Sequence, residues 1–481
     1  MIVMKVLVVS FDGLQPSQIN KDLMPNLYGY LHDGVTFSNH HAVYPSVTRI
    51  NSTSMFTGRT PGSHGIAANM VVMRDYDPNS VFSVLQPVLE EIRAKLGDVL
   101  YVKNIGDILS EAGEKFIAVG AGTTGNSFLQ NPNAHKNGGA VVNPEFTLPY
   151  DLEKTLISKF GEWPAEVVPN EKRLKRCVDM MTEYFIPEID PVVGLIWFSD
   201  PDKSHHADGV GNEIGTAAIR YADQHFGELV ERVRNNDKSK DADIIVISDH
   251  GYSTIQEVID VRKELITAGL LQNEEDDSVL IAPNGGSALF YVKNSDKEIT
   301  QKLINTLMEF EWCGPLFSSS KVGEFEGVLS TDLIGIEGPR CPDIAMSFHW
   351  NSEKNKAGYP GMIYSTGGDV DLGTHGSISK HEMNNVLGAF GPNFKKGITC
   401  STPTGNIDLT PTILHILGIN TETSFDGRPI KEALINDINP DEVKVSTTEH
   451  VSENSQTGYS QKLVISSVGD TKYIDYAERA N

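Results

Sequence analysis

Acidic residues and histidines follow several apolar runs of strand length, where they could act together as metal ligands. Three runs end in such residues: 6–11 in Asp12, 192–198 in Asp200 and Asp202, and 244–248 in Asp249 and His250. The carboxyl ends of parallel strands meet at one edge of a sheet, so we expect these side chains to converge there. Crowded carboxylates repel each other and raise their pKa values unless a cation lies between them. A mixture of Asp and His favours zinc or a similar divalent ion over calcium or magnesium.

Two further histidines complete the set of candidate ligands. His206 follows Asp202 by four residues, so a helical turn would place both side chains on one face, where they could bind the same ion. His375 lies in a stretch with glycines at 373 and 376, which allow the backbone to approach a ligand closely. The six candidates are Asp12, Asp202, His206, Asp249, His250 and His375. Six ligands fit two metal ions with three protein ligands each, which leaves coordination positions for water or substrate.

The candidate nucleophile is the hydroxyl of Thr48. Pro45 and Ser46 are helix start signals and Gly58 is a stop signal, so the sequence predicts a helix of about ten residues between them. Thr48 would lie in its first turn, where free N–H groups and the positive end of the helix dipole favour an alkoxide and a phosphate. Asn51 would share its face and could donate a hydrogen bond to a phosphoryl oxygen. No residue of this segment is a base, so a metal beside Thr48 would have to lower the pKa of its hydroxyl.

Each of these residues also has an ordinary structural explanation. An Asp or His after a strand is commonly a turn former or a helix cap, and Thr48 alone could simply begin a helix. His64, in Ser63-His64-Gly65, has a structural explanation of the same kind. The functional interpretation depends on the coincidence of the whole set in this chain order, which is far more specific than any one member.

A framework of alternating strands and helices must hold these residues. Near-continuous apolar runs are typical of parallel strands buried on both faces, and here they alternate with segments of helical periodicity. The strand-like runs are 5–9, 116–119, 192–198 and 243–247, and the helix-like segments include 102–111 and 217–233. The sequence therefore predicts an α/β fold with a layered, mostly parallel central sheet flanked by helices.

The pattern of polar and apolar residues changes after residue 434. We expect a catalytic domain over residues 1–434 and a C-terminal extension over 435–481, packed on that domain. Residues 435–454 are polar and typical of a loop. Residues 461–468 and 472–476 alternate in polarity around Gly469-Asp470, which predicts a β-hairpin.

Charge and composition limit the partners. The 481 residues include 40 Lys+Arg and 64 Asp+Glu, a formal net charge of −24, which makes a nucleic-acid polymer an unfavourable partner. A small phosphorylated substrate is compatible with this charge if bound cations reverse the local field. No apolar run reaches the roughly 18 residues of a membrane helix, so we expect no membrane association. With no signal peptide at its start, the chain as given is expected to be cytoplasmic, or secreted or periplasmic if a leader has been removed.

In this order, the candidate residues resemble the alkaline phosphatase superfamily, above all its nucleotide pyrophosphatase/phosphodiesterase branch, the type I phosphodiesterases. The likeness covers residues 5 to about 434. It is carried by Phe11-Asp12-Gly13, by the block from Thr48 through Gly58 to Ser63-His64-Gly65-Ile66, by Asp200-Pro201-Asp202 through His206, by Ser248-Asp249-His250-Gly251 and by Thr374-His375-Gly376-Ser377. Asp200 stands where the family usually has Glu, and His205 where it has Gly, which could alter the pocket.

The resemblance implies an alkaline phosphatase-like fold, two zinc ions (or other divalent ions) and a covalent phospho-threonine intermediate. By analogy, one zinc is held by Asp202, His206 and His375, and the other by Asp12, Asp249 and His250 beside Thr48, which would be both nucleophile and metal ligand. Asn51 would be the oxyanion donor. Two in-line displacements would give net retention at phosphorus.

Three functions stay open at this point. The first is hydrolysis of small phosphodiester or pyrophosphate substrates, with nucleotides among the candidates. The second is a zinc-dependent phosphonate hydrolase, similar to phosphonoacetate hydrolase, which would need a cation for the substrate carboxylate; the strand-end loop 120–132 contains no Lys or Arg. The third is a non-catalytic scaffold that binds metal and phosphate. The sequence does not define the oligomeric state.

Overall fold

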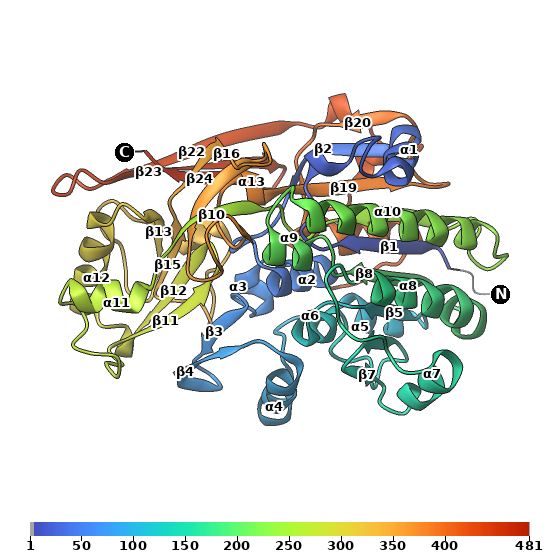
Figure 1. Cartoon of the computed structure of the whole chain (residues 1–481), viewed down its shortest axis with the longest axis horizontal. Coiled ribbons are helices and arrows are strands. Elements are labelled where there is room, and N and C mark those ends of the chain that lie inside the picture. Colours follow the sequence, from blue (N-terminus) through green and yellow to red (C-terminus); the bar gives the residue numbers. More distant parts are fainter. Residues whose placement is uncertain (1–3, 481) are drawn as a thin grey trace.

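A mixed sheet of ten strands forms the centre of the protein, in a computed structural model that describes residues 4–480 (Figure 1). Its strand order is β20 (Ile398–Cys400), β2 (Val35–His41), β19 (Asn384–Phe390), β9 (Asp243–Ile247), β1 (Val6–Phe11), β8 (Val193–Phe198), β5 (Phe116–Gly120), β6 (Ala140–Asn143) and β7 (Phe146–Leu148), with β21 (Thr404–Gly405) also paired to β2. The predicted runs form the neighbours β9, β1, β8 and β5, all mutually parallel. Strand β19 is antiparallel to both of its neighbours. The predicted α/β fold with a mostly parallel central sheet is confirmed.

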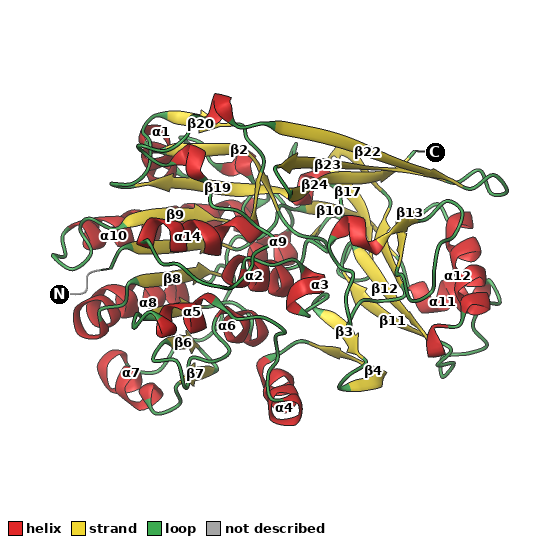
Figure 2. Cartoon of the chain, turned by 180° about the vertical axis from the view of Figure 1, so that it is seen from behind, coloured by secondary structure: helices red, strands yellow, loops and turns green. Residues whose placement is uncertain are grey.

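Helices cover both faces of this sheet, because successive residues of each central strand point to opposite sides. On β1, Val6 and Val8 belong to one hydrophobic core and Leu7 and Val9 to the other. The first core is covered by α2 (Thr48–Thr57), α5 (Ile105–Glu111), α6 (Thr124–Gln130) and α14 (Leu409–Leu417), and the second by α1 (Pro25–Asp33), α8 (Glu171–Met180) and α10 (Glu213–Arg234). Figures 1 and 2 show the protein from opposite sides. Helices α10 and α8 lie in front of the sheet in Figure 1, and α14 lies in front of it in Figure 2.

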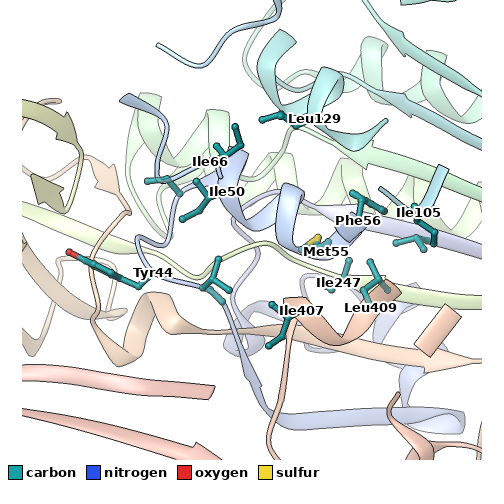
Figure 3. Close-up of a cluster of buried hydrophobic side chains, with 14 of the residues drawn as sticks. Tyr44, Ile50, Met55, Phe56, Ile66, Ile105, Leu129, Ile247, Ile407 and Leu409 are labelled. Atoms are coloured by element: carbon teal, nitrogen blue, oxygen red, sulfur yellow. The ribbon is translucent and has the colours of Figure 1, made fainter. Parts of the chain in front are cut away.

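The helix that begins with Thr48 is anchored through its apolar side. Ile50, Met55 and Phe56 are fully buried. Met55 and Phe56 lie near Ile247 of the central sheet and Leu409 of α14, and Ile50 lies near Ile66 (Figure 3). Helix α2 is therefore fixed against the sheet by residues that take no part in the candidate chemistry.

A second group of sheets packs beyond the carboxyl ends of the central strands and supplies one candidate ligand. It comprises a five-stranded sheet, β11 (Val279–Asn284), β12 (Ser287–Val292), β15 (Ile344–Phe348), β13 (Cys313–Ser318) and β14 (Leu329–Ser330), and a four-stranded sheet, β16 (Trp350–Lys354), β17 (Pro360–Ser365), β10 (Ser253–Val258) and β18 (Gly373–Thr374). Helices α11 (Val261–Thr267) and α12 (Lys297–Glu309) share a hydrophobic core with the five-stranded sheet. His375 directly follows β18.

Shorter elements complete the fold. They are α3 (Pro61–His64), β3 (Met70–Met73), β4 (Asp77–Ser83), α4 (Gln86–Leu96), α7 (Leu152–Phe160), α9 (Asp202–Asp208) and α13 (Lys380–Met383). Within residues 4–480, no helix has the length and apolar character needed to cross a bilayer.

The C-terminal region contains the predicted hairpin, formed by β23 (Ser460–Val468) and β24 (Thr471–Arg479). The prediction of a loop over 435–454 is wrong in part, because β22 (Val445–Glu453) adds a third strand along β23. Most side chains of β22 are exposed on both faces, so its sequence lacks the alternation that marks a half-buried strand. The sheet contacts the rest of the chain through Trp350, whose Nε1 donates to Ala477 O (2.8 Å). The domain division at residue 434 stays a prediction.

Candidate active site

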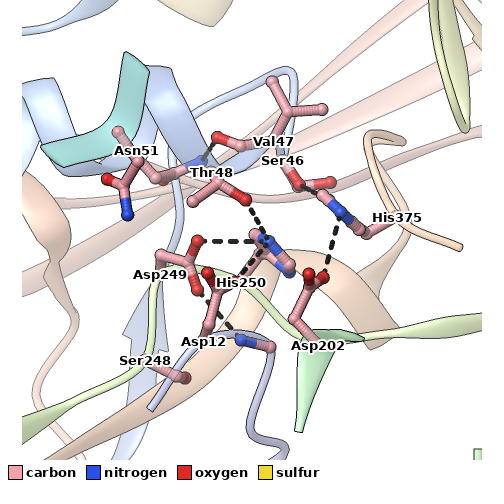
Figure 4. Close-up of polar contacts among 12 residues, drawn as sticks. Asp12, Ser46, Val47, Thr48, Asn51, Asp202, Ser248, Asp249, His250 and His375 are labelled. Atoms are coloured by element: carbon pink, nitrogen blue, oxygen red, sulfur yellow. Dashed lines mark hydrogen bonds and ion pairs between the residues drawn. The ribbon is translucent and has the colours of Figure 1, made fainter. Parts of the chain in front are cut away.

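Helix α2 places Thr48 at the centre of the site. Val47 is extended and Thr48 is the first helical residue, while Gly58 ends the helix in a left-handed conformation (φ 67°), as the start and stop signals predict. Thr48 is 8% exposed, and its Oγ1 lies 3.3 Å from Nε2 of His250 (Figure 4). The hydroxyl therefore faces the histidine of the Asp249-His250 pair across 202 residues of chain.

Metal-ligand donors gather in two groups that share His250. One group is Asp12, Asp249 and His250, the other is Asp202, His250 and His375, and within each group one ligand atom per residue lies within 4.8 Å of the others. The structure thus brings together the strand-end acids that were predicted to converge.

In the first group, Nε2 of His250 lies 3.2 Å from Asp249 Oδ2 and 3.7 Å from Asp12 Oδ1. The carboxylates are oriented by their other oxygens: Gly13 N–H donates to Asp249 Oδ1 (3.0 Å) and Trp197 Nε1–H donates to Asp12 Oδ2 (3.0 Å). One oxygen of each carboxylate is thereby fixed, and the other is directed into the site.

In the second group, Asp202 Oδ1 lies 3.4 Å from Nε2 of His375 and 3.3 Å from Nε2 of His206. Asp202 and His206 are one helical turn apart on α9, as predicted. The same oxygen accepts a hydrogen bond from the hydroxyl of Tyr252 (2.8 Å), a residue that sequence reasoning did not single out. All six predicted ligands therefore line one site.

The three histidines share one orientation. The Nδ1–H of His206 donates to Gly373 O (3.0 Å), that of His250 to Gly251 O (2.9 Å) and that of His375 to Ser46 O (2.8 Å). A proton fixed on Nδ1 leaves the lone pair of Nε2 directed at the carboxylates, which is the tautomer that a metal ligand requires.

The electrostatics of the site indicate that a cation belongs there. Burial and the nearby Asp249 and Asp202 carboxylates raise the pKa of Asp12 well above its ordinary value. Burial alone would lower the pKa of His250, but the Asp249 carboxylate raises it to about 9, and a divalent ion at Nε2 would take the place of that second proton. Asp12 Oδ1 and Asp249 Oδ2 are buried and accept no hydrogen bond within the described part of the chain. Unpartnered buried carboxylate oxygens beside the Nε2 atoms of the histidines form a donor set that fits divalent metal ions.

Asn51 does not take the place that the sequence predicted for it. Its side chain is fully buried, and its Oδ1 accepts from Val43 N–H (2.7 Å) and from Asn406 Nδ2 (2.8 Å). Its Nδ2 donates to Val47 O (3.1 Å) and Val43 O (3.2 Å). These bonds leave no donor for a phosphoryl oxygen, so the amide fixes the entry of the chain into α2 instead, away from the Thr48 hydroxyl (Figure 4).

Sequence reasoning missed Asn69 and Arg49, which lie directly beside Thr48. The N–H of Arg49 donates to Asn69 Oδ1 (3.1 Å) across 20 residues of chain. No hydrogen bond from Asn69 Nδ2 is found among residues 4–480, and the side chain is partly exposed. No local pattern marked Asn69, and the signal for Arg49 was a cation next to the candidate nucleophile.

Three further residues have structural roles. Asp200 accepts from Ser204 Oγ (2.7 Å) and Asn170 N–H (2.8 Å). His205 is buried with its ring centroid 5.0 Å from that of Tyr252, so it lies behind the site and does not line it. Phe128 is fully buried and is not available to stack on a base.

The sequence matches the family described as type I phosphodiesterase / nucleotide pyrophosphatase over residues 6–376. The ectonucleotide pyrophosphatase/phosphodiesterase family member 7 of Mus musculus is 23% identical over 447 residues, which cover 88% of this chain and 85% of that protein. The bis(5'-adenosyl)-triphosphatase ENPP4 of Bos taurus is 23% identical over 422 residues, covering 86% and 78%. The chain spans about half the length of two Caenorhabditis elegans ectonucleotide pyrophosphatase/phosphodiesterases, 48% and 44%, to which it is 20% and 23% identical.

Among solved structures, murine ectonucleotide pyrophosphatase / phosphodiesterase 5 superposes with a TM-score of 0.65 at 19% identity, covering 90% of this chain and 100% of that one. An inactive variant of the same murine protein, in complex with AMP, gives a TM-score of 0.63. At this identity the likeness establishes the fold. Because the family match extends over most of the chain, from β1 through His375, the protein belongs to the type I phosphodiesterase / nucleotide pyrophosphatase family.

Proposed function

We propose that the protein is a two-zinc hydrolase of small phosphodiester or pyrophosphate substrates, nucleotides among them, which acts through a phospho-threonine at Thr48. The observation that carries this proposal is the 3.3 Å approach of Thr48 Oγ1 to His250 Nε2, the ligand atom of the one residue shared by both donor groups. The relatives support the substrate class: one is named a bis(5'-adenosyl)-triphosphatase, and a structural neighbour was solved with AMP.

The metal-binding roles follow the two donor groups and the orientation of the histidines. Asp12, Asp249 and His250 would hold one ion with Thr48. Asp202 and His375 of the second group would hold the other, together with His206, whose Nε2 lies 3.3 Å from Asp202 Oδ1. When bound, zinc would supply the Lewis acidity that lowers the pKa of the Thr48 hydroxyl and offsets the charge of the phosphoryl oxygens.

The chain's own residues would then carry the reaction. Thr48 Oγ loses its proton and attacks phosphorus, the bond from phosphorus to the leaving oxygen breaks, and that oxygen takes up a proton. Water then attacks phosphorus and the Thr48 Oγ–phosphorus bond breaks, which returns the hydroxyl. Asn69, whose Oδ1 is fixed by Arg49 N–H, offers its Nδ2 to a phosphoryl oxygen, with the positive end of α2 beside it.

The first test is the hydrolysis of bis-p-nitrophenyl phosphate, p-nitrophenyl phosphate and phosphonoacetate, with metal content measured on the same sample. We expect preference for the diester and about two zinc ions per chain. Preference for phosphonoacetate would show that the substrates are phosphonates and not phosphodiesters. Absence of turnover in protein that contains metal would favour the non-catalytic scaffold.

The nucleophile is tested by Thr48→Ala, which we expect to lower kcat at least about 10³-fold with zinc retained. Thr57→Ala is the matched control, since it removes a buried hydroxyl from the same helix that bonds only Thr53 O (2.7 Å). Near-normal turnover of zinc-loaded Thr48→Ala would exclude the covalent mechanism.

A further inference from the structure

Arg49, the residue after Thr48, is a buried cation without an acidic partner. Its side chain is 8% exposed, and its Nη1 donates to Asn69 O (3.1 Å) and Ser83 Oγ (3.0 Å), both neutral. Its Nε is buried and has no hydrogen-bond partner in the described residues. Throughout residues 4–480, no carboxylate lies within ion-pairing distance of this guanidinium.

The other buried arginine of the described residues, Arg340, has an acidic partner, as burial of a charge ordinarily demands. It forms an ion pair with Asp75 (2.8 Å) and donates to the carbonyls of Gly65 and Val99. Arg49 has no such acidic partner within residues 4–480, and a cation left unpaired at this depth has free capacity for an anion that these residues do not supply.

Arg49 lies next to the candidate nucleophile in the chain. Consecutive Cα atoms are about 3.8 Å apart, so the backbone of Arg49 is adjacent to that of Thr48. Asn69 fixes it at both ends, accepting from its backbone N–H through Oδ1 (3.1 Å) and from its guanidinium through the backbone carbonyl (3.1 Å). Asn69 therefore ties the residue that follows Thr48 to the start of β3, and Ser83 of β4 accepts from the same guanidinium nitrogen.

We propose that Arg49 is a specificity-determining residue that binds a second anionic group, a carboxylate or a phosphate, on the molecule whose phosphorus Thr48 attacks. The proposal rests on the proposed function for the position of that phosphorus. It defines the substrate class as phosphoryl compounds that carry another anion near the scissile bond. The guanidinium suits both groups, because its planar fork donates in parallel to two oxygens of a carboxylate or phosphate. A substrate carboxylate would need a cation, and loop 120–132 contains no Lys or Arg. Arg49 of α2 would supply that cation.

The test separates binding from turnover. Zinc-loaded Thr48→Ala protein is titrated calorimetrically with methylphosphonate, phosphonoacetate and methylenediphosphonate, and the zinc content is measured before and after. We expect the two ligands with a second anion to bind at least about tenfold more tightly than methylphosphonate. Arg49→Gln in the same background should remove most of that difference, and Arg49→Lys should retain part of it. The ligand that loses more affinity identifies the second anion as carboxylate or phosphate.

Arg220→Gln is the matched control, because it removes the same charge from an exposed position on α10. If Arg49→Gln lowers the affinity for all three ligands equally, or if Arg220→Gln has the same effect, the proposal is wrong. Far-UV circular dichroism gives the folded fraction of Arg49→Gln, and the dissociation constants of this variant are corrected for that fraction. If Arg49→Gln does not fold, the proposal is tested by the affinities of Arg49→Lys and by the ranking of the three ligands in the Thr48→Ala protein.

Turnover is measured on carboxymethyl and methyl p-nitrophenyl phosphate, which share one leaving group. We expect the carboxymethyl ester to have the higher kcat/KM, and Arg49→Gln to lower the ratio of the two values at least about tenfold. Loss of activity toward both esters in equal proportion would contradict the inference. If neither ester is hydrolysed while the binding difference still depends on Arg49, the proposed function fails and the anion site stands.

Discussion

Asn51 and Asn69 both lie near Thr48, and the hydrogen bonds of their side-chain amides indicate different roles. The amide of Asn51 is saturated by the backbone around Val43 and Val47 and by Asn406. Within residues 4–480, the side-chain amide of Asn69 is engaged only through Oδ1, by Arg49 N–H. An amide with no free donor stabilises the fold, and one with a free Nδ2 beside a nucleophile can stabilise developing charge.

Alanine at each position separates the two roles. We expect Asn51→Ala to lower the free energy of unfolding by about 3 kcal/mol, because Val43 N–H and Asn406 Nδ2 would lose their acceptor in the interior. We expect Asn69→Ala to lower kcat/KM about 10²- to 10³-fold with a stability loss of only about 1 kcal/mol. Urea unfolding and steady-state kinetics on zinc-loaded protein measure both quantities. The assignment is reversed if Asn51→Ala is the kinetic variant and Asn69→Ala the unstable one.

The sequence predicted the convergence of the candidate ligands but not the position of the Asn51 side chain, for a physical reason. Five of the six candidate ligands stand at the end of an apolar run or one turn along a helix, and such local signals survive into the fold. Asn51 shares the spacing of a helical neighbour of Thr48, but long-range partners such as Asn406 decide where its amide points. Asn69 reaches Arg49 only after the chain has passed through α3, and no local spacing encodes that contact.

At the scale of elements, the position of Thr48 depends on how α2 is closed at both ends. At the far end, Gly58 has φ 67°, and a Cβ there would lie 2.7 Å from Phe425 Cδ1 and 3.1 Å from Pro411 Cδ. Glycine is therefore needed for the left-handed backbone that ends α2 and for the close contact with Phe425 and Pro411. A larger residue would strain both the backbone and the packing.

Gly58→Ala should therefore be more costly than the same change at an open helix end. Gly97, which follows α4 with φ 92°, is the matched control, because a Cβ added there would meet no atom within 4 Å. We expect Gly97→Ala to lower the free energy of unfolding by about 1 kcal/mol and Gly58→Ala by about 3 kcal/mol. Equal losses in urea unfolding would show that Phe425 and Pro411 move aside without cost.

Two of the elements that were not predicted, β22 and β18, have sequences without apolar periodicity toward a core. Strand β22 is exposed on both faces, so its position depends on pairing with β23. Strand β18, which positions His375, has only two residues and is held by antiparallel pairing with β10. Such strands are stabilised by their neighbours, and a single sequence gives no direct signal for them.

For the whole molecule, the candidate metal centre joins parts of the chain that are far apart. Asp12 follows β1, Asp202 begins α9, and His375 follows β18 in the second group of sheets. Burial and the neighbouring carboxylates of Asp249 and Asp202 disfavour the charged form of Asp12 and raise its pKa. Bound zinc should therefore stabilise the whole fold, by about 4 kcal/mol at a free concentration a thousandfold above its dissociation constant.

Chelation of the protein and of Asp12→Asn tests this coupling. Zinc should raise the Tm of the parent protein, and Asp12→Asn should lose most of that gain because a ligand is missing. Without metal, Asp12→Asn should melt above the metal-free parent, because it removes one of the repelling buried charges. Asp22→Asn, an exposed carboxylate nearby in the sequence, should change neither value. An equal zinc-dependent gain in the parent and in Asp12→Asn would mean that zinc stabilises the protein elsewhere, and the ligand assignment of the first donor group would have to be abandoned.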